Sequence, residues 1–325
     1  MFSKNTSLVV IFFLFIGCQS TTKTPSWVLA PNVNYPESIT AVGEGNSLDD
    51  AKKKALSAIN QRLWTQVSSS SQSRNIANNI NGGDHYQQLN DFSLNTKTSE
   101  LVLSGVEYTK AEQVGPLYYV EAKVFKTSLR NQLVADIDKI NEHAKFELSA
   151  LAHTDLLVWW LKNRNVEELE KELTVKTSML AALSTPNDYE PKTVLPLLKS
   201  NVSRVKSQII ITISGGQEEE LMKDLLTNLF SKYNIPVVDY KKGAYSHNLI
   251  LDTHWNNSSI ADIFVSTARV NLIVKDEKSL VVASNEIIAN ANSVTSFERA
   301  REGVSRSFSA KVKEQDFWKA LGFDF

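Results

Sequence analysis

The sequence predicts an α+β protein with two small domains separated by a helical hairpin. Strand-like apolar runs bounded by glycine occur at both ends of the chain. Glycine is absent between Gly115 and Gly215, where apolar residues recur at helical spacing. We expect a domain of order βαβββ at 25–126, a helical hairpin and spacer at 127–206, and a domain of order βαββββα at 207–325.

The first 17 residues have the pattern of a signal peptide. The apolar run Leu8–Ile16 suits an h-region and is too short to cross a bilayer, which needs about 20 residues. The sequence Phe15-Ile16-Gly17-Cys18 resembles the lipobox of bacterial lipoproteins, although Phe15 stands where Leu is usual. Cys18 is the only cysteine and is the predicted lipidation point. The alternative is a secretory signal with an incidental cysteine.

Lipidated Cys18 would begin the mature chain, followed by a short tether at 18–24. Gln19 is not the Asp that retains many lipoproteins at the inner membrane, so resemblance to that sorting rule favours the periplasmic face of the outer membrane. No later segment is long and apolar enough to span a membrane, which makes the bilayer contact of the acyl chains the expected anchor.

The charge balance excludes one class of partner. The chain has 35 basic and 36 acidic side chains and a formal net charge of −1. Nucleic-acid binding depends on neutralising phosphates with basic residues, so we expect no nucleic-acid partner. We also expect no cofactor.

In the first domain we expect a strand at Ile39–Val42, a helix at Ser47–Trp64 and a polar strand at Thr65–Arg74. Two β stretches, Phe92–Val114 and Leu117–Phe125, follow.

Gly43 and Gly45 precede this helix in the order of parts of a phosphate-binding loop. The third small residue of a dinucleotide fingerprint is replaced by Leu48, and acidic residues at the helix start would repel a pyrophosphate. We expect a structural turn in which the glycines adopt positive φ and Ser47 or Asn46 caps the helix. Its predicted apolar face comprises Leu48, Ala51, Ala55, Ile59 and Leu63.

The stretch "PSWV…YPESITAVGEGNSLDDAKKKALSAINQRLWTQVSSS" is similar to the Lpp-twenty family of bacterial membrane-associated lipoproteins. The likeness covers residues 25 to about 126. Related domains occur in flagellar outer-membrane lipoproteins and flagellar outer-ring proteins, which implies a role in envelope assembly. The C-terminal domain is loosely similar to α+β modules of envelope assembly proteins and of lipoprotein activators of peptidoglycan synthases, by element order alone.

The hairpin is expected at 127–183, with Asn165 as N-cap of the returning helix, and a third helix at 193–206. In the last domain, "SQIIITISGG" predicts a strand, and a helix follows with Leu221, Leu225 and Leu229 on one face. Four further strands and a closing helix are expected, the helix with this apolar face: Phe297, Ala300, Val304, Phe308 and Val312.

Catalytic motifs are missing, so we expect that the protein is not an enzyme. Asp252 and His254 share one face of a predicted strand and are candidate metal ligands, but two ligands make no site without partners that the sequence does not identify.

Four aromatic residues are candidate partner contacts. Trp159 and Trp160 are adjacent on a helix, where one hairpin core rarely buries both, and Phe317 and Trp318 lie in an aromatic C-terminal tail. The alternative is that all four pack inside the chain.

Together these features predict a non-enzymatic outer-membrane lipoprotein that acts through protein–protein contacts in cell-envelope assembly, with a flagellar structure as one setting. The alternatives are an activator of a peptidoglycan synthase, a periplasmic hydrolase and a metal-binding protein. The sequence does not decide whether the protein forms a homo-oligomer.

Overall fold

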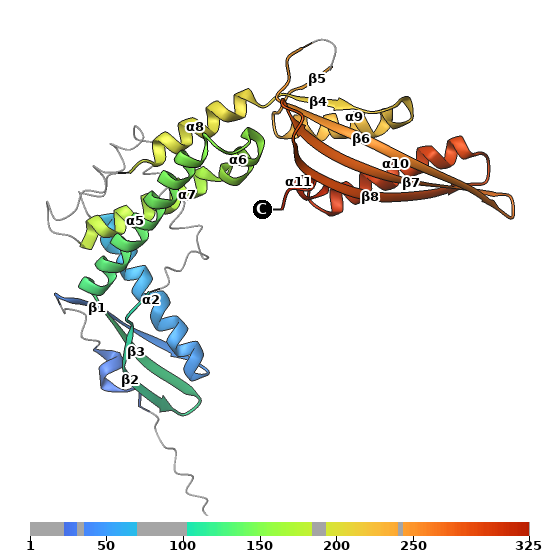
Figure 1. Cartoon of the computed structure of the whole chain (residues 1–325). Helices are drawn as coiled ribbons and strands as arrows, with labels where there is room; N and C mark the ends of the chain where they lie inside the picture. Colours follow the sequence, from blue (N-terminus) through green and yellow to red (C-terminus); the bar gives the residue numbers. More distant parts are fainter. Residues whose placement is uncertain (1–22, 31–35, 70–102, 184–192, 240–242, 325) are drawn as a thin grey trace, which may run out of the picture. The chain divides into compact units, whose positions relative to one another are not determined.

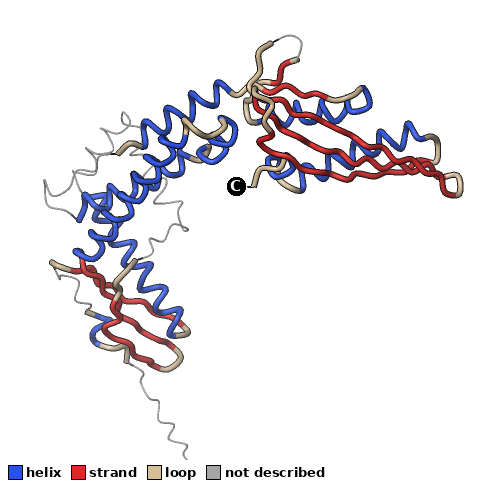
Figure 2. The backbone as a smooth tube through the Cα atoms, viewed as in Figure 1, coloured by secondary structure: helices blue, strands red, loops and turns tan. Residues whose placement is uncertain are grey.

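A computed structural model describes residues 23–30, 36–69, 103–183, 193–239 and 243–324. The chain divides into two compact units, residues 1–134 with 178–188 and residues 135–177 with 189–325. Both helices and sheets are present, so the predicted α+β class is confirmed (Figure 2).

The first unit contains a three-stranded antiparallel sheet in the order β1-β3-β2 (Figure 1). Its strands are β1 (Ser38–Gly45), β2 (Glu107–Val114) and β3 (Leu117–Phe125). Helix α2 (Leu48–Ser69) packs on one face, and the short α1 (Ser26–Leu29) precedes β1. The buried apolar side chains of β1, β3 and α2 are Ile39, Ala41, Tyr119, Val120, Ala122, Val124, Ala51, Ala55, Ile59, Leu63 and Val67.

The two glycines before α2 serve close packing, and the prediction of a positive-φ turn is wrong. Gly43 and Gly45 lie within β1, and neither has positive φ. A Cβ on Gly43 would stand 2.1 Å from the Ala51 carbonyl oxygen, and one on Gly45 would stand 2.4 Å from the Ala51 nitrogen. Glycine is required because the helix backbone runs directly over the strand.

Helix α2 is capped as predicted but ends later. The Asp50 N–H donates to Ser47 Oγ at 3.2 Å, an N-cap bond. Residues 65–69 continue the helix where a strand was predicted, because Val67 extends the buried stripe of Leu63 by one more turn. Leu48, predicted on the apolar face, is 38% exposed. Residues 70–74 and 92–102 of the predicted strands lie outside the described residues.

The helical region contains α5 (Lys126–Ala150), α6 (Leu156–Asn163), α7 (Val166–Leu183) and α8 (Leu195–Gln208). The first arm of the predicted hairpin is therefore broken into α5 and α6. The break falls at 151–155, where Asp155 caps a new helix. Ion pairs tie these helices together, Lys176 to Asp136 at 2.5 Å and Lys199 to Glu170 at 2.6 Å.

The second unit contains a five-stranded sheet in the order β5-β4-β6-β7-β8 (Figure 1). Strand β4 runs parallel to β5 and β6, and the remaining neighbours are antiparallel. The strands are β4 (Ile211–Ser214), β5 (Val237–Val238), β6 (His247–Ile260), β7 (Ile263–Asp276) and β8 (Val281–Ser293). With α9 (Glu220–Lys232) and α10 (Phe297–Glu314), the predicted order βαββββα is found, and α11 (Phe317–Ala320) follows it.

One face of this sheet is buried under helices. On β6, β7 and β8 alternate residues are buried, and α10 contacts β7 and β8 with Ala300, Val304, Phe308 and Val312 fully buried, as predicted. The α9 face is shifted from the prediction: Leu221 is 56% exposed, while Met222, Leu226, Leu229 and Phe230 are buried. The observed stripe includes Phe230, whose ring packs edge-on against Phe317 at 4.9 Å.

Candidate functional site

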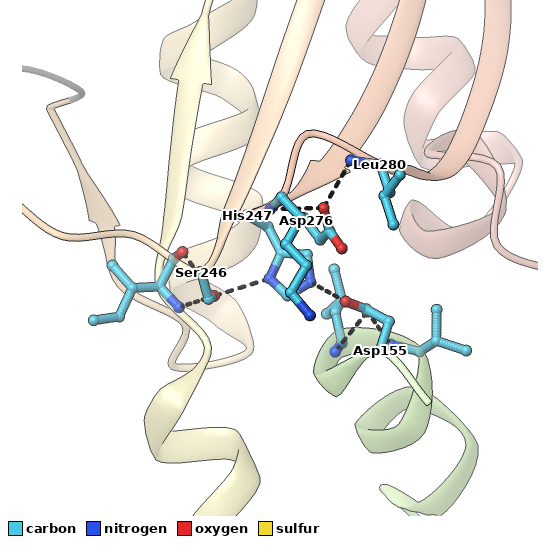
Figure 3. Close-up of polar contacts among 9 residues, drawn as sticks. Asp155, Ser246, His247, Asp276 and Leu280 are labelled. Carbon is cyan, nitrogen blue, oxygen red and sulfur yellow. Dashed lines mark hydrogen bonds and ion pairs between the residues drawn. The ribbon is translucent and has the colours of Figure 1, made fainter. Parts of the chain in front are cut away.

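A cleft of about 490 Å³ opens in the second unit. Residues 152–155, which precede α6, and Leu156, its first residue, line one part of it, and the turn that joins β7 to β8 lines another. Ser246 and His247, at the start of β6, complete the lining. The polar contacts of this cleft are drawn in Figure 3.

Asp155 serves two elements at once. Its Oδ1 accepts from the N–H groups of Leu157 at 2.9 Å and Val158 at 3.0 Å, which caps the N-terminus of α6. Its Oδ2 lies 2.9 Å from His247 Nε2, on strand β6 (Figure 3). The side chains are 18% and 2% exposed, so the Asp155–His247 pair is nearly closed to water. The pair therefore joins α6 to the sheet.

Ser246 completes a chain of polar contacts. Its Oγ lies 2.8 Å from His247 Nδ1, accepts from the Ile210 N–H at 2.8 Å and stands 3.0 Å from the Ile210 carbonyl oxygen (Figure 3). The single hydroxyl proton can go to the carbonyl or to the imidazole, and the roles of the ring nitrogens follow from that choice. Backbone and imidazole together hold this hydroxyl in place.

Burial and hydrogen bonding have opposite effects on the pKa of Asp155, and hydrogen bonding has the larger effect. Burial would raise the pKa of its carboxyl group, but the hydrogen bond and charge of His247 and the two backbone N–H groups outweigh it. The pKa of Asp155 therefore lies below its ordinary value, and the carboxylate is ionised at neutral pH.

The β7–β8 turn contributes the carboxylate of Asp276, which already accepts hydrogen bonds from the backbone of the turn. Asp276 Oδ1 accepts from the N–H groups of Lys278 at 2.9 Å and Leu280 at 2.7 Å (Figure 3). Ser279 adopts a φ of 65°, which closes this tight turn. The exposed side chains of Glu277 and Lys278 remain at the mouth of the cleft.

The set Ser246, His247 and Asp155 contains the residue types of a hydrolase triad. A nucleophilic serine needs a free hydroxyl that points at substrate, whereas Ser246 Oγ is engaged by both backbone groups of Ile210. Asp155 is likewise engaged by the α6 N-terminus. The geometry therefore favours a structural role, in which these hydrogen bonds hold together α6, β6 and the segment before β4.

The predicted metal ligands are near each other on an open surface. His254 Nε2 lies 3.8 Å from Asp252 Oδ2, and the side chains are 71% and 55% exposed. Among the described residues, no group of three or more His, Cys, Asp or Glu side chains could hold a metal. The pair thus lacks the third protein ligand of a metal site.

The four aromatic residues predicted as partner contacts are buried, so this prediction is wrong and internal packing is found. Trp159, Trp160, Phe317 and Trp318 are 0%, 4%, 6% and 2% exposed. Trp160 packs edge-on against Trp318 at 5.7 Å, and Trp159 Nε1 donates to the Glu147 carbonyl oxygen at 2.7 Å. Both tryptophans are buried because they face different neighbours, one on α5 and one on the C-terminal segment.

Cys18, the predicted lipidation point, lies outside the described residues. None of the helices in the described ranges has the length and apolar character that a membrane span requires.

The Asp155–His247 pair was missed in the sequence. Asp155 before "LLVWWL" is a recognisable N-cap signal, but its partner lies 92 residues away and no local pattern links them.

Comparison with known proteins agrees with the family resemblance of the first domain. Residues 25–125 match the LPP20 lipoprotein family. The match covers less than a third of the chain, on the unit built from α1, α2 and β1–β3. This match supports the assignment of the chain as a lipoprotein.

Solved structures give further likenesses of the backbone. The secreted protein HP1454 of Helicobacter pylori is 15% identical, with a TM-score of 0.46 over 85% of this chain and 97% of its own. A minor lipoprotein of Acinetobacter baumannii is 7% identical, with a TM-score of 0.28 over 34% of this chain and 92% of its own. Lipoprotein B of Nitrosomonas europaea is 12% identical, with a TM-score of 0.24 over 35% of this chain and 86% of its own. No curated protein matches the sequence.

Proposed function

We propose that this protein is a lipoprotein of the outer membrane, anchored at the periplasmic face through acylated Cys18. It acts without catalysis, by binding other proteins of the cell envelope, and flagellar structures are one setting for this role. The observation that carries the proposal is the match of residues 25–125 to a lipoprotein family, directly after the lipobox-like Phe15–Cys18.

The geometry of the cleft supports a non-enzymatic role. Its serine, histidine and aspartate are each engaged in bonds that join structural elements. A catalytic serine would need a hydroxyl free to attack. In this cleft the same residue types hold α6 against the sheet.

An affinity pull-down from crosslinked cells tests the proposal. The wild-type lipoprotein is compared with Cys18→Ala, which has the same folded part without the acyl anchor. We expect the wild type alone to recover outer-membrane or flagellar ring proteins, because only the anchored form is held beside them.

Two results would contradict the proposal. Equal recovery of a peptidoglycan synthase by both forms would favour an activator, with the lipid as a tether only. Recovery of no envelope protein by either form, together with hydrolysis of peptidoglycan by the purified chain, would make the protein an enzyme.

A further inference from the structure

Strand β8 forms an edge of the five-stranded sheet. It pairs with β7 on one side, and no strand among the described residues pairs with its other side. In an antiparallel edge strand every second residue directs its N–H and C=O away from the sheet. Such groups are a template for another strand.

The beginning of this edge is covered by the chain's own C-terminal segment. A Cβ on Gly322 would stand 2.3 Å from the Ser284 carbonyl oxygen, so the segment lies directly against the strand. Asn285 Nδ2 also donates to the Ala320 carbonyl oxygen at 3.1 Å. The part of the edge beyond this cover runs from Glu286 to Ser293.

The uncovered part of β8 lacks the features that usually block edge pairing. Residues 287–296 contain no charged side chain, no proline and no glycine. Glu286, just before them, is paired with Arg269 on β7 at 3.5 Å. The irregularity in the β7–β8 register falls between Val274 and Lys275, opposite the start of β8, so the pairing is regular along the uncovered part.

The edge strand β2 of the first unit differs in both respects. It carries Glu107, Lys110 and Glu112 along its exposed length. Its register also shifts between Tyr108 and Lys110. Charges and bulges are the devices by which proteins discourage edge-to-edge pairing, and the uncovered part of β8 has neither after Glu286.

We propose that the uncovered edge of β8 pairs antiparallel with the β8 edge of a second copy of this chain. A twofold axis brings identical edges together antiparallel, and the two sheets then form one continuous sheet. Because residues 287–296 are uncharged, the two edges do not repel each other. The exposed amides of Asn290 and Asn292 each offer a donor and an acceptor, so they can bond to their own counterparts.

The length of the edge sets the strength of this contact. Eight residues of strand span about 27 Å. Such a contact belongs to the small interfaces, below about 1,200 Å² in total, that form weak and reversible complexes. The dimer is therefore concentration-dependent, and it needs no lipid anchor.

Disulfide crosslinking tests the proposal directly. The full chain carries Cys18→Ala, so that an introduced cysteine is the sole thiol whether or not the native residue is acylated. Cysteine replaces one of Ile288, Asn290 or Asn292, which share the exposed face of β8. Matched controls are Thr267→Cys, partly exposed on strand β7, which has a strand neighbour on both sides, and Ala111→Cys, exposed on the edge strand β2.

We expect Asn290→Cys, near the middle of the uncovered part, to form a disulfide dimer at least about tenfold faster than either control, since pairing raises the local thiol concentration near the axis. The rate falls at the other two β8 positions as distance from the axis grows. Equal rates at all five positions would overturn the proposal.

A charge variant gives a second readout by sedimentation velocity. We expect the Cys18→Ala chain to associate reversibly as its concentration rises. Asn290→Lys should remain monomeric, because two lysines would meet across the axis, while Thr267→Lys, on the interior strand β7, should associate like the parent. A parent that stays monomeric at the highest concentration, or a dimer that survives Asn290→Lys, would overturn the proposal.

Discussion

At the scale of single residues, Asp155 holds the second unit together at one point. It caps α6 and binds His247, whose side chain is 2% exposed. Asp155→Ala should lower the free energy of unfolding of this unit by about 3 kcal/mol, because the buried His247 side chain loses its hydrogen-bond partner and a helix loses its cap. Urea denaturation followed by tryptophan fluorescence measures the change. The control Asp252→Ala removes a carboxylate that is 55% exposed and should cost less than about 0.5 kcal/mol.

The same substitution has a pH signature. The pKa of Asp155 is lowered in the folded protein, so its contribution to stability is complete above the unfolded pKa, about 3.9, and is lost as the pH falls through the lower folded value. The stability difference between wild type and Asp155→Ala should shrink as the pH falls from about 5 to below about 4. A difference that grows over this acidic range would show that the carboxylate is not stabilised as described.

Gly43 is the second residue with a single structural task. A methyl group there would overlap the backbone of α2 at Ala51, so Gly43→Ala should destabilise the first unit by at least about 2 kcal/mol. Gly243→Ala is the control, since its Cβ would meet no described residue closer than Val238 at 4.0 Å. Thermal unfolding compares each variant with wild type. An unchanged transition in Gly43→Ala would mean that helix and strand are farther apart than described.

At the scale of elements, α11 is the least obvious part of the second unit. Trp318 contacts Trp160, Phe230 and Tyr233, at ring distances of 5.7, 5.9 and 5.1 Å. Trp318→Ala should destabilise this unit by about 3–5 kcal/mol and expose the C-terminal segment to hydrogen exchange. Leu221→Ala, at a side chain that is 56% exposed, is the control. If hydrogen exchange in residues 316–324 is the same in Trp318→Ala and wild type, Trp318 does not hold this tail in place. The prediction of a partner contact would then apply again.

Elements with a strong local pattern could be predicted from the sequence. The four strands expected before the closing helix include β7 and β8, and the stripe from Ala300 to Val312 predicted α10. Where one helix has two possible apolar stripes, the sequence does not show which stripe is buried. On α9 the choice between Leu221 and Met222 depends on Phe317, which is distant along the chain.

The candidate site was harder to predict than the fold. The capping role of Asp155 is readable in its position before an apolar helix, but its pairing with His247 exists only because the fold brings α6 to β6. Likewise, burial of Trp160 depends on Trp318, 158 residues later in the numbering. Local patterns carry no information on such contacts.

At the scale of the whole molecule, the central feature is the proposed acylation of Cys18. The folded part begins soon after Cys18, since the described chain starts at Lys23. Loss of the anchor should release the protein from the membrane without unfolding it, because Cys18 precedes every described element. Fractionation of cells with Cys18→Ala checks this, and circular dichroism of the released protein is the control. Membrane retention of the variant would point to a second attachment.

The most direct measurement is the mass of the N-terminal peptide of the mature protein purified from membranes. We predict a chain that begins at Cys18 and carries acyl chains on this residue. A mature chain with an unmodified Cys18, or one cleaved elsewhere, would contradict the lipoprotein assignment and the proposed function built on it.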